Sequence, residues 1–281
     1  MKMIVNKENS ATIPIDLDEV LQHSVEAAKR AARILQENYG KLKPEDIKKK
    51  HAFDFVTEVD KAAEFEIINY LQEFYPDHRI FAEESGKNQA ESDFQWLIDP
   101  LDGTKNYIHC IPNYGVSIAL RYRDEIITGV INVPPWQELF TAKKEGGAFL
   151  NDEPIHVSTT NDFAVCMLAT GFPHDAKQYL DVYLDCFKHL FLQVSAIRRP
   201  GAAAVDLANV ACGRFDGFWE FKLNPWDIGA GLLLIKEAGG IVSDPMGGEN
   251  HLSTGDVAAG NPAIYEKIIK IIKPICEGRL G

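Results

Sequence analysis

Two stretches near the start of the chain repeat apolar residues at intervals of three and four positions. The first covers residues 17–38 and predicts an amphipathic helix that ends before Gly40. The second covers residues 59–74, and Thr57 and Asp60 stand at its start in the Ser/Thr-x-x-acid arrangement of a capping box. The pattern therefore predicts two helices ahead of any sheet.

The pattern changes between residues 96 and 149, where short β-rich runs alternate with Asp, Gly, Asn and Pro, which predicts a meander of strands. From about residue 153, strand-like and helix-like segments alternate, as in an α/β layer. The segments expected to be helical in this second half are 176–192, 201–211 and 227–238. Since no internal repeat or flexible linker occurs, we expect one domain over 1–281, with halves of about 1–152 and 153–281 sharing a core.

Composition narrows the class of protein. Hydrophobic residues make up 46% of the chain and charged residues 25%, as in ordinary globular proteins. The net charge of −12 and the pI near 5.1 make direct nucleic-acid binding improbable, because that binding relies on Lys and Arg. The sequence lacks a signal-type apolar region and a run of eighteen apolar residues, and its five cysteines are scattered. These features favour the cytoplasm and argue against secretion and membrane spanning.

The candidate chemistry begins where the apolar run WLI meets Asp99-Pro-Leu-Asp102. One interpretation is a polar turn in which Asp102 caps the next helix, and the other is a place for a cation. Gly103 and Thr104 follow directly, and a Gly-Thr step at a helix start exposes N–H groups that suit a phosphate. This stretch therefore leaves both interpretations open.

Two other segments end in acids. Glu83 follows the apolar run RIFA, and Asp227 follows Pro225 at an expected helix start. Carboxylates at strand ends tend to converge at one edge of a sheet. At a separation of about 4 Å, two such charges repel by about 4 kcal/mol at an effective dielectric of 20, so a cluster would need cations. Oxygen ligands of this kind suit Mg²⁺, and two ions with a phosphate define hydrolysis by in-line displacement.

WLIDPLDGTKNY, FAEES, NPWDIGAG and FDFVTEVD together resemble the inositol monophosphatase family, the lithium-sensitive, magnesium-dependent phosphomonoesterases. The resemblance covers residues 18–265 in order, and RRPGAAAVDLANVACGRFDGFWEF is similar to the bacterial branch. It implies a layered αβαβα sandwich of the inositol monophosphatase and fructose-1,6-bisphosphatase type, mixing α/β and α+β layers. It also implies a homodimer and two to three Mg²⁺ ions.

The same resemblance assigns roles to particular residues. The ligands implied for the first Mg²⁺ are Glu83, Asp99 and the carbonyl of Leu101, and those for the second are Asp99, Asp102 and Asp227. Gly103 and Thr104 would bind the phosphate. Asp60 would accept a hydrogen bond from Thr104, so that Thr104 and Glu83 position the attacking water; Asp60 would also serve as a helix cap.

Substrate contacts are implied for Asp227, Glu220 and the backbone of Ala203. Glu220 matches a position that contacts inositol hydroxyls, although pairing with Lys222 is an alternative. The chain departs from the family at Ala202, where a Ser or Thr is common, so the hydroxyl that would meet the sugar is missing. We expect catalysis to survive this departure and the substrate preference to depend on it.

The leading hypothesis is hydrolysis of inositol 1-phosphate by metal-activated water. Relatives with the same motif act on fructose 1,6-bisphosphate, NADP or 3′-phosphoadenosine 5′-phosphate, so these substrates stay open. An aspartyl-phosphate scheme is disfavoured, because the two aspartates lie three apart with Pro between them. Bacterial members are also associated with transcription antitermination of ribosomal RNA, which makes a protein partner in the transcription machinery, with catalysis dispensable, the alternative of a different class.

Overall fold

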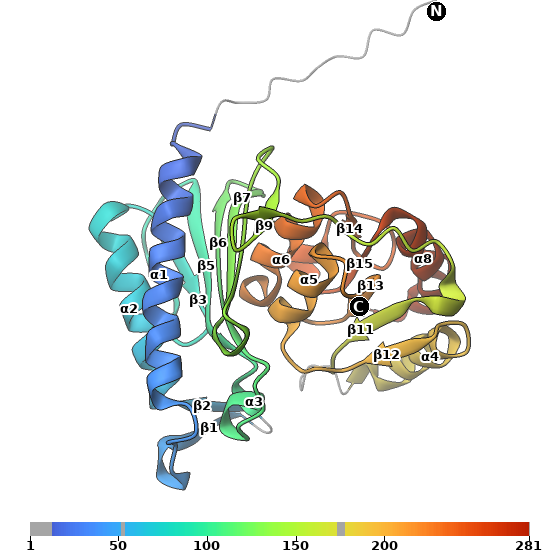
Figure 1. The fold of residues 1–281 in the computed structure, drawn as a ribbon, viewed down its shortest axis with the longest axis horizontal. Helices are drawn as coiled ribbons and strands as arrows, with labels where there is room; N and C mark the ends of the chain where they lie inside the picture. Colours follow the sequence, from blue (N-terminus) through green and yellow to red (C-terminus); the bar gives the residue numbers. More distant parts are fainter. Residues whose placement is uncertain (1–12, 52–53, 173–177, 281) are drawn as a thin grey trace, which may run out of the picture.

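The computed structural model describes residues 13–51, 54–172 and 178–280. Its elements form five layers, in which helices and sheets alternate as α, β, α, β, α (Figure 1). The helices are α1 (Leu17–Asn38), α2 (Glu58–Phe74), α3 (Thr104–Ile108), α4 (Leu180–Phe191), α5 (Ala203–Ala211), α6 (Pro225–Glu237), α7 (His251–Thr254) and α8 (Pro262–Cys276). No described helix combines the length and the apolar character needed to span a membrane. The expected layered sandwich is confirmed.

Helices α1 and α2 form the first layer and cover one face of the larger sheet (Figure 1). Both helices lie where the apolar pattern predicted them. Asp16 caps α1 by accepting a hydrogen bond from the Asp18 N–H, and the predicted capping box of Thr57 and Asp60 begins α2. Their apolar stripes are buried against the sheet, so burial of one face holds each helix in place.

The larger sheet has eight strands in the order β10-β9-β8-β7-β6-β5-β3-β4. Its strands are β3 (Arg79–Ala82), β4 (Gly86–Lys87), β5 (Phe94–Asp102), β6 (Gly115–Tyr122), β7 (Glu125–Val133), β8 (Glu138–Lys143), β9 (Ala148–Leu150) and β10 (Glu153–Pro154). Neighbouring strands from β5 to β9 pair antiparallel, which confirms the predicted meander. Strands β3 and β5 instead run parallel, so their carboxyl ends meet at one edge of the sheet.

Helices α5 and α6 form the middle layer, between the two sheets (Figure 1). Helix α6 lies very close to β7, because a Cβ at Gly129 would stand 2.9 Å from the Ala230 carbonyl oxygen. The start of α6 is also tied to β6 by the Ser117 hydroxyl, which donates to the Trp226 carbonyl at 3.1 Å. These two contacts fix where the first turn of α6 lies relative to the larger sheet.

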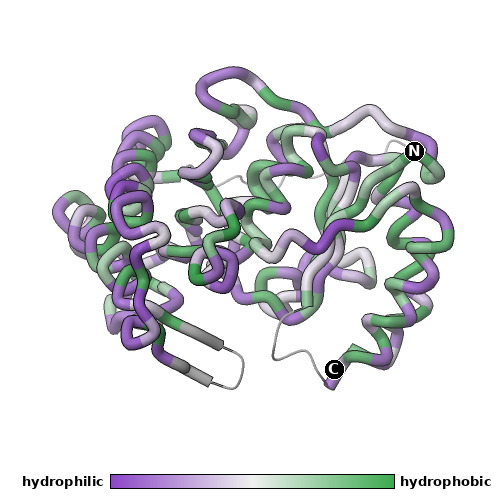
Figure 2. The backbone as a smooth tube through the Cα atoms, turned by 60° about the horizontal axis from the view of Figure 1, so that its bottom comes forward, coloured by the Kyte–Doolittle hydropathy of each residue, from purple (hydrophilic) through white to green (hydrophobic). Residues whose placement is uncertain are grey.

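The smaller sheet has five strands in the order β12-β11-β13-β15-β14. Its strands are β11 (Met167–Thr170), β12 (Ala196–Arg198), β13 (Gly217–Glu220), β14 (Ile241–Ser243) and β15 (Val257–Gly260). Strands β12, β11 and β13 are parallel, whereas β15 is antiparallel to both neighbours, and their alternation with helices agrees with the expected α/β layer. Helices α4 and α8 form the outer layer. In Figure 2, the helix leading to the C-terminus alternates between hydrophobic and hydrophilic positions, and its apolar face packs on this sheet.

Several elements lack a counterpart in the sequence predictions. A separate two-stranded sheet joins β1 (Ile47–His51) to β2 (Asp54–Thr57). Helix α8 and strand β15 complete the second half. The first two residues of the predicted helix 176–192 lie outside the described residues. Helix α4 (Leu180–Phe191) covers most of the rest of that prediction.

Candidate metal and phosphate site

Asp99 and Asp102 both lie at the end of β5, with only 2% and 7% of their surfaces exposed. Residues three apart on a regular strand point to opposite faces, but the pairing of β5 with β6 is irregular between these two. Pro100 lies in this interval and has no N–H to give to the ladder. The irregularity therefore lets both carboxyl groups enter one cluster.

The interpretation of Asp102 as a helix cap is wrong. Gly103 occupies the cap position before α3, in a left-handed conformation with φ of 90° that glycine adopts without strain. Asp102 instead accepts a hydrogen bond at 3.1 Å from the N–H of Val205, which lies at the start of α5. Strand β5 also continues through the Asp-Pro step, so that step does not close the strand.

Glu83 reaches the cluster because it follows β3, which runs parallel to β5. Its N–H donates to the Ile98 carbonyl at 3.1 Å, so the two strand ends stay in step. The turn after Glu83 is held by Glu64 of α2, whose carboxylate accepts the N–H groups of Glu84 and Ser85, each at 2.8 Å. Sequence reasoning missed Glu64, and an acid within the apolar stripe of α2 was the available signal.

Asp227 enters the cluster from the first turn of α6, as predicted from Pro225. Its carboxylate accepts the Asn224 N–H at 2.7 Å and forms a capping box with Asn224. The helix dipole and this hydrogen bond favour the charged carboxylate. The protein packed around Asp227 has a larger effect and raises its pKa to about 6.

The carboxyl groups repel one another. Burial, followed by the charges of Glu83, Asp102 and Asp227, raises the pKa of Asp99 well above its usual range. Burial also raises the pKa of Asp102 to about 7, even though N–H groups at the start of α5 favour its charged form. A cation bound there would relieve this repulsion.

The donor chemistry of this cluster fits a hard cation, because every side-chain donor is a carboxylate oxygen. Within the described residues, no group of three or more His, Cys, Asp or Glu side chains is already arranged to hold a metal ion. The Leu101 carbonyl, predicted as a further ligand, here accepts a hydrogen bond from the Thr104 hydroxyl at 3.1 Å.

Thr104, at the start of α3, lies beside the cluster. Its hydroxyl is 3.3 Å from Asp60 Oδ1, so the predicted contact between these two side chains is confirmed. Asp60 is fully buried, and its other oxygen accepts the Thr57 N–H at 2.9 Å, so it caps α2 at the same time. Because one hydroxyl carries one proton, the Leu101 carbonyl and Asp60 compete for the Thr104 donor.

The start of α5 approaches the cluster from the second half of the chain. The backbone N–H groups of Ala203 and Ala204 lie toward Asp102, together with that of Val205. The Ala203 N–H, predicted to be available to a substrate, is therefore shared with this carboxylate. Asn106 fixes the approach, since its amide donates to the carbonyls of Asn113 at 2.8 Å and Pro200 at 2.9 Å.

Glu220 lies at the end of β13 and is only 5% exposed. Burial raises its pKa well above the usual range, the Asp227 charge adds to this, and Arg199 opposes it. The alternative pairing with Lys222 is wrong, because the Lys222 ammonium lies 3.3 Å from Asp256.

Asp206 of α5 is an acid near this site that sequence reasoning missed. It is 1% exposed, its Oδ1 has no hydrogen-bond partner, and burial, Glu220 and Asp102 together raise its pKa. A single acid within the apolar run AAVDLANVA was the signal.

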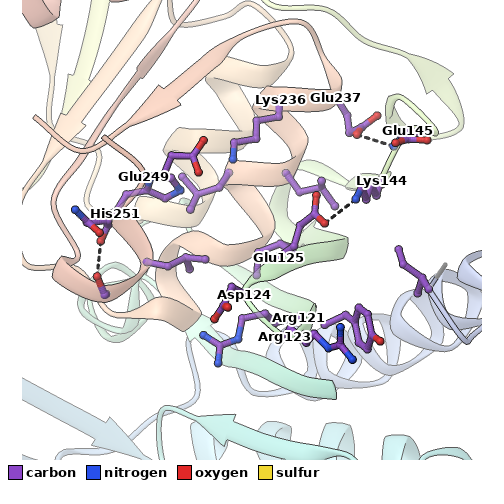
Figure 3. Close-up of a pocket in the computed structure, with 18 residues that line it drawn as sticks. Arg121, Arg123, Asp124, Glu125, Lys144, Glu145, Lys236, Glu237, Glu249 and His251 are labelled. Atoms are coloured by element: carbon purple, nitrogen blue, oxygen red, sulfur yellow. Dashed lines mark hydrogen bonds and ion pairs between the residues drawn. The ribbon is translucent and has the colours of Figure 1, made fainter. Parts of the chain in front are cut away.

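A separate pocket of about 820 Å³ lies at the opposite end of α6 (Figure 3). Charges of both signs line it, and several are paired. Lys144 lies 2.6 Å from Glu125, and the Glu237 carboxylate accepts the Glu145 N–H at 2.8 Å. None of the clustered carboxylates described above lines this pocket.

Comparison with known proteins identifies the family. The sequence profile of the inositol monophosphatase family matches residues 16–277, and the chain belongs to this family. The Nus factor SuhB of Escherichia coli K12 is 45% identical over 251 residues, which cover 89% of this chain and 94% of that protein. The fructose-1,6-bisphosphatase/inositol-1-monophosphatase of Aquifex aeolicus is 41% identical over 266 residues, covering 92% and 98%.

Solved structures agree with this assignment. The extragenic suppressor protein suhB of Bartonella henselae is 40% identical and superposes with a TM-score of 0.87 over 91% of this chain and 98% of that one. The inositol monophosphatase of Anabaena is 38% identical, with a TM-score of 0.83 over 92% and 97%. The family consists of metal-dependent phosphatases that typically use Mg²⁺.

Proposed function

We propose that this protein is a magnesium-dependent phosphomonoesterase that hydrolyses inositol 1-phosphate. The observation that carries the proposal is the convergence of Glu83, Asp99, Asp102 and Asp227, where burial and then mutual repulsion raise the pKa of Asp99. A surplus of negative charge beside a Gly-Thr helix start suits cations that also bind a phosphate. The family assignment supports the same reaction class.

We propose two to three Mg²⁺ ions, and the predicted ligands fall into two sets, one for each of two ions. Glu83, Asp99 and the Leu101 carbonyl would hold one ion, and Asp99, Asp102 and Asp227 the other. When bound, such ions lower the pKa of water and stabilise the leaving oxygen of the ester. The Leu101 carbonyl has two lone pairs, so it could bind an ion as well as accept a hydrogen bond, and the Thr104 hydroxyl could instead donate to Asp60.

The remaining residues orient the reactants. Thr104 and Glu83 would hold the attacking water. Asp60 would accept a hydrogen bond from the Thr104 hydroxyl, so that a lone pair of this hydroxyl oxygen could accept a hydrogen bond from that water. The N–H groups of Gly103 and Thr104 would bind the phosphate. Glu220, Asp227 and the Ala203 backbone would contact the polyol.

The first test measures phosphate release from D-myo-inositol 1-phosphate while Mg²⁺ is titrated. We expect Asp99→Asn to lose roughly a thousandfold or more in rate, because it removes several kcal/mol of transition-state stabilisation. Asp124→Asn is the matched control, because Asp124 is exposed beside the pocket at the other end of α6. Equal rates for wild type and Asp99→Asn would contradict the proposal.

Two observations favour alternatives. The name of the Aquifex relative includes fructose-1,6-bisphosphatase, so parallel assays should include fructose 1,6-bisphosphate, NADP and 3′-phosphoadenosine 5′-phosphate. A catalytic efficiency well above that for inositol 1-phosphate would reassign the substrate. Relatives named Nus factor favour a partner in the transcription machinery, and Asp99→Asn that keeps partner binding and cellular function would make catalysis dispensable.

We infer further that residues 1–281 act as one catalytic domain whose two halves meet at the site. Asp102 and Val205, one from each half, are hydrogen-bonded to each other, which supports this inference. We also propose that the protein assembles as a homodimer, is inhibited by lithium and resides in the cytoplasm.

A further inference from the structure

Gly171 and Glu220 lie next to each other at the carboxyl ends of two parallel strands. Strand β11 ends at Thr170 and pairs with β13, with Thr170 opposite Trp219, so the next residues in step are Gly171 and Glu220. The Thr170 hydroxyl donates to the Trp219 carbonyl at 2.6 Å and holds this register. The two positions are therefore fixed relative to each other by the sheet.

The Glu220 carboxyl occupies the space that a side chain at Gly171 would need. A Cβ built on Gly171 would lie 2.1 Å from Glu220 Oε1, 2.3 Å from Oε2 and 2.4 Å from Cδ. These separations are far below van der Waals contact, so a methyl group and this carboxyl position exclude each other. Glu220 is 5% exposed, so the surrounding protein leaves it little room for another arrangement.

Backbone conformation does not explain the glycine. Gly171 has no left-handed φ, so an L-amino acid can adopt its backbone conformation. Nearby charges bear on the carboxyl from several sides: Arg199 attracts it, whereas Asp227 and Asp102 repel it. A carboxyl displaced from Gly171 would keep its charge but change its direction.

We propose that Gly171 is a specificity-determining positioning residue, whose missing side chain sets where the Glu220 carboxyl lies and hence how polyol hydroxyls are bound. This inference rests on the proposed function, in which Glu220 contacts the polyol. Gly171 itself touches no reacting atom in this scheme. It acts through Glu220 alone.

The test compares two substrates in three variants. The substrates are inositol 1-phosphate and 4-nitrophenyl phosphate, and the second has no polyol hydroxyls. We expect Gly171→Ala and Glu220→Gln each to lower the ratio of the two kcat/KM values about tenfold to hundredfold, as for a lost hydrogen bond to a charged group. The change should lie mainly in the KM for inositol 1-phosphate. The double variant should lose no more than the larger single loss, because both substitutions disturb one contact.

Gly240→Ala is the matched control, since a Cβ there would meet Ile235 Cγ2 at 2.6 Å, away from the proposed polyol contacts. It should lower the thermal unfolding midpoint but keep the substrate ratio. A wild-type ratio in Gly171→Ala would overturn the inference, whatever its stability. If Gly171→Ala does not fold, the double variant Gly171→Ala/Glu220→Ala should fold as Glu220→Ala does, because the clashing carboxyl is gone. A double variant that does not fold would also overturn the inference.

The inference and the proposed function fail in different ways. A wild-type protein that releases no phosphate from either ester refutes the proposed function. A wild-type protein that turns over both esters, beside a Gly171→Ala variant with an unchanged ratio, refutes only the role of Gly171.

Discussion

The two ends of helix α6 gather charge in different ways. At its N-terminal end, Asp227 joins carboxylates from two strand ends, and burial and repulsion raise the pKa of Asp99 and Asp102. At its C-terminal end, the pocket contains both signs of charge, and Lys144 is paired with Glu125 (Figure 3). The difference lies in the balance of sign: carboxylates predominate at the first end, where the proposed cations would bind.

The largest expected effect comes from neutralising one carboxylate at the N-terminal end. Asp227→Asn should lose roughly a thousandfold or more in kcat/KM for inositol 1-phosphate, because it removes a proposed ligand and a polyol contact. Glu249→Gln, at the pocket, should stay within about twofold, since it lies at the opposite end of α6. Steady-state kinetics at saturating Mg²⁺ measure both. Similar losses in the two variants would remove the distinction between the two ends of the helix.

A smaller effect is expected at Thr104. Thr104→Ala removes the hydroxyl that lies between Asp60 and the Leu101 carbonyl, so we expect a loss of about tenfold to a hundredfold in kcat. Thr104→Ser retains the hydroxyl and should recover most of the rate. If the Ser variant is as slow as the Ala variant, the methyl group and its packing matter instead of the proton position.

The smallest effect concerns stability and pH. The pKa of Asp102 is raised from 3.8 to about 7, so the folded protein holds a proton that the unfolded chain releases. This contribution is complete at low pH and is lost as the pH rises through 7. Between pH 6.5 and 8, deprotonation of Asp102 alone should lower the free energy of unfolding of the metal-free protein by about 1 kcal/mol, which corresponds to a decrease of roughly 2 °C in Tm.

Calorimetry with EDTA and with Mg²⁺ measures this effect. His78 and His251 have buried rings with lowered pKa values, so they contribute with the opposite sign, but they are present under both conditions, and the difference between EDTA and Mg²⁺ therefore reports the carboxylates. We expect Mg²⁺ to reduce the pH dependence, because a bound cation replaces the protons. An identical pH profile with and without Mg²⁺ would show that the carboxylates bind no cation in the folded protein.

Local patterns predicted much of this molecule. The apolar stripe of α1, the capping box of α2 and the meander from β5 to β9 depend on neighbours in sequence, and all three are present. The acids at strand ends could be singled out for the same reason, since each directly follows an apolar run or a helix-starting proline.

Features that depend on distant partners escaped prediction. The use of Asp102 depends on Val205, 103 positions further along the chain, so the local helix-cap interpretation failed. Glu64 acts through a turn twenty residues away, and Gly171 matters only because β11 and β13 are neighbours. A sequence pattern contains no measure of such distances.

The bond between Asp102 and Val205 also bears on how the chain folds. It closes a loop of 103 residues. Contacts of this range form late in folding, because the entropy cost of closing the loop must be met before the contact contributes any stabilisation. A cation that needs Asp102 and Asp227 together can then bind only after both sheets have assembled. Such a cation would slow unfolding and leave the folding rate almost unchanged. It would therefore extend the lifetime of the folded state without helping the chain to reach that state.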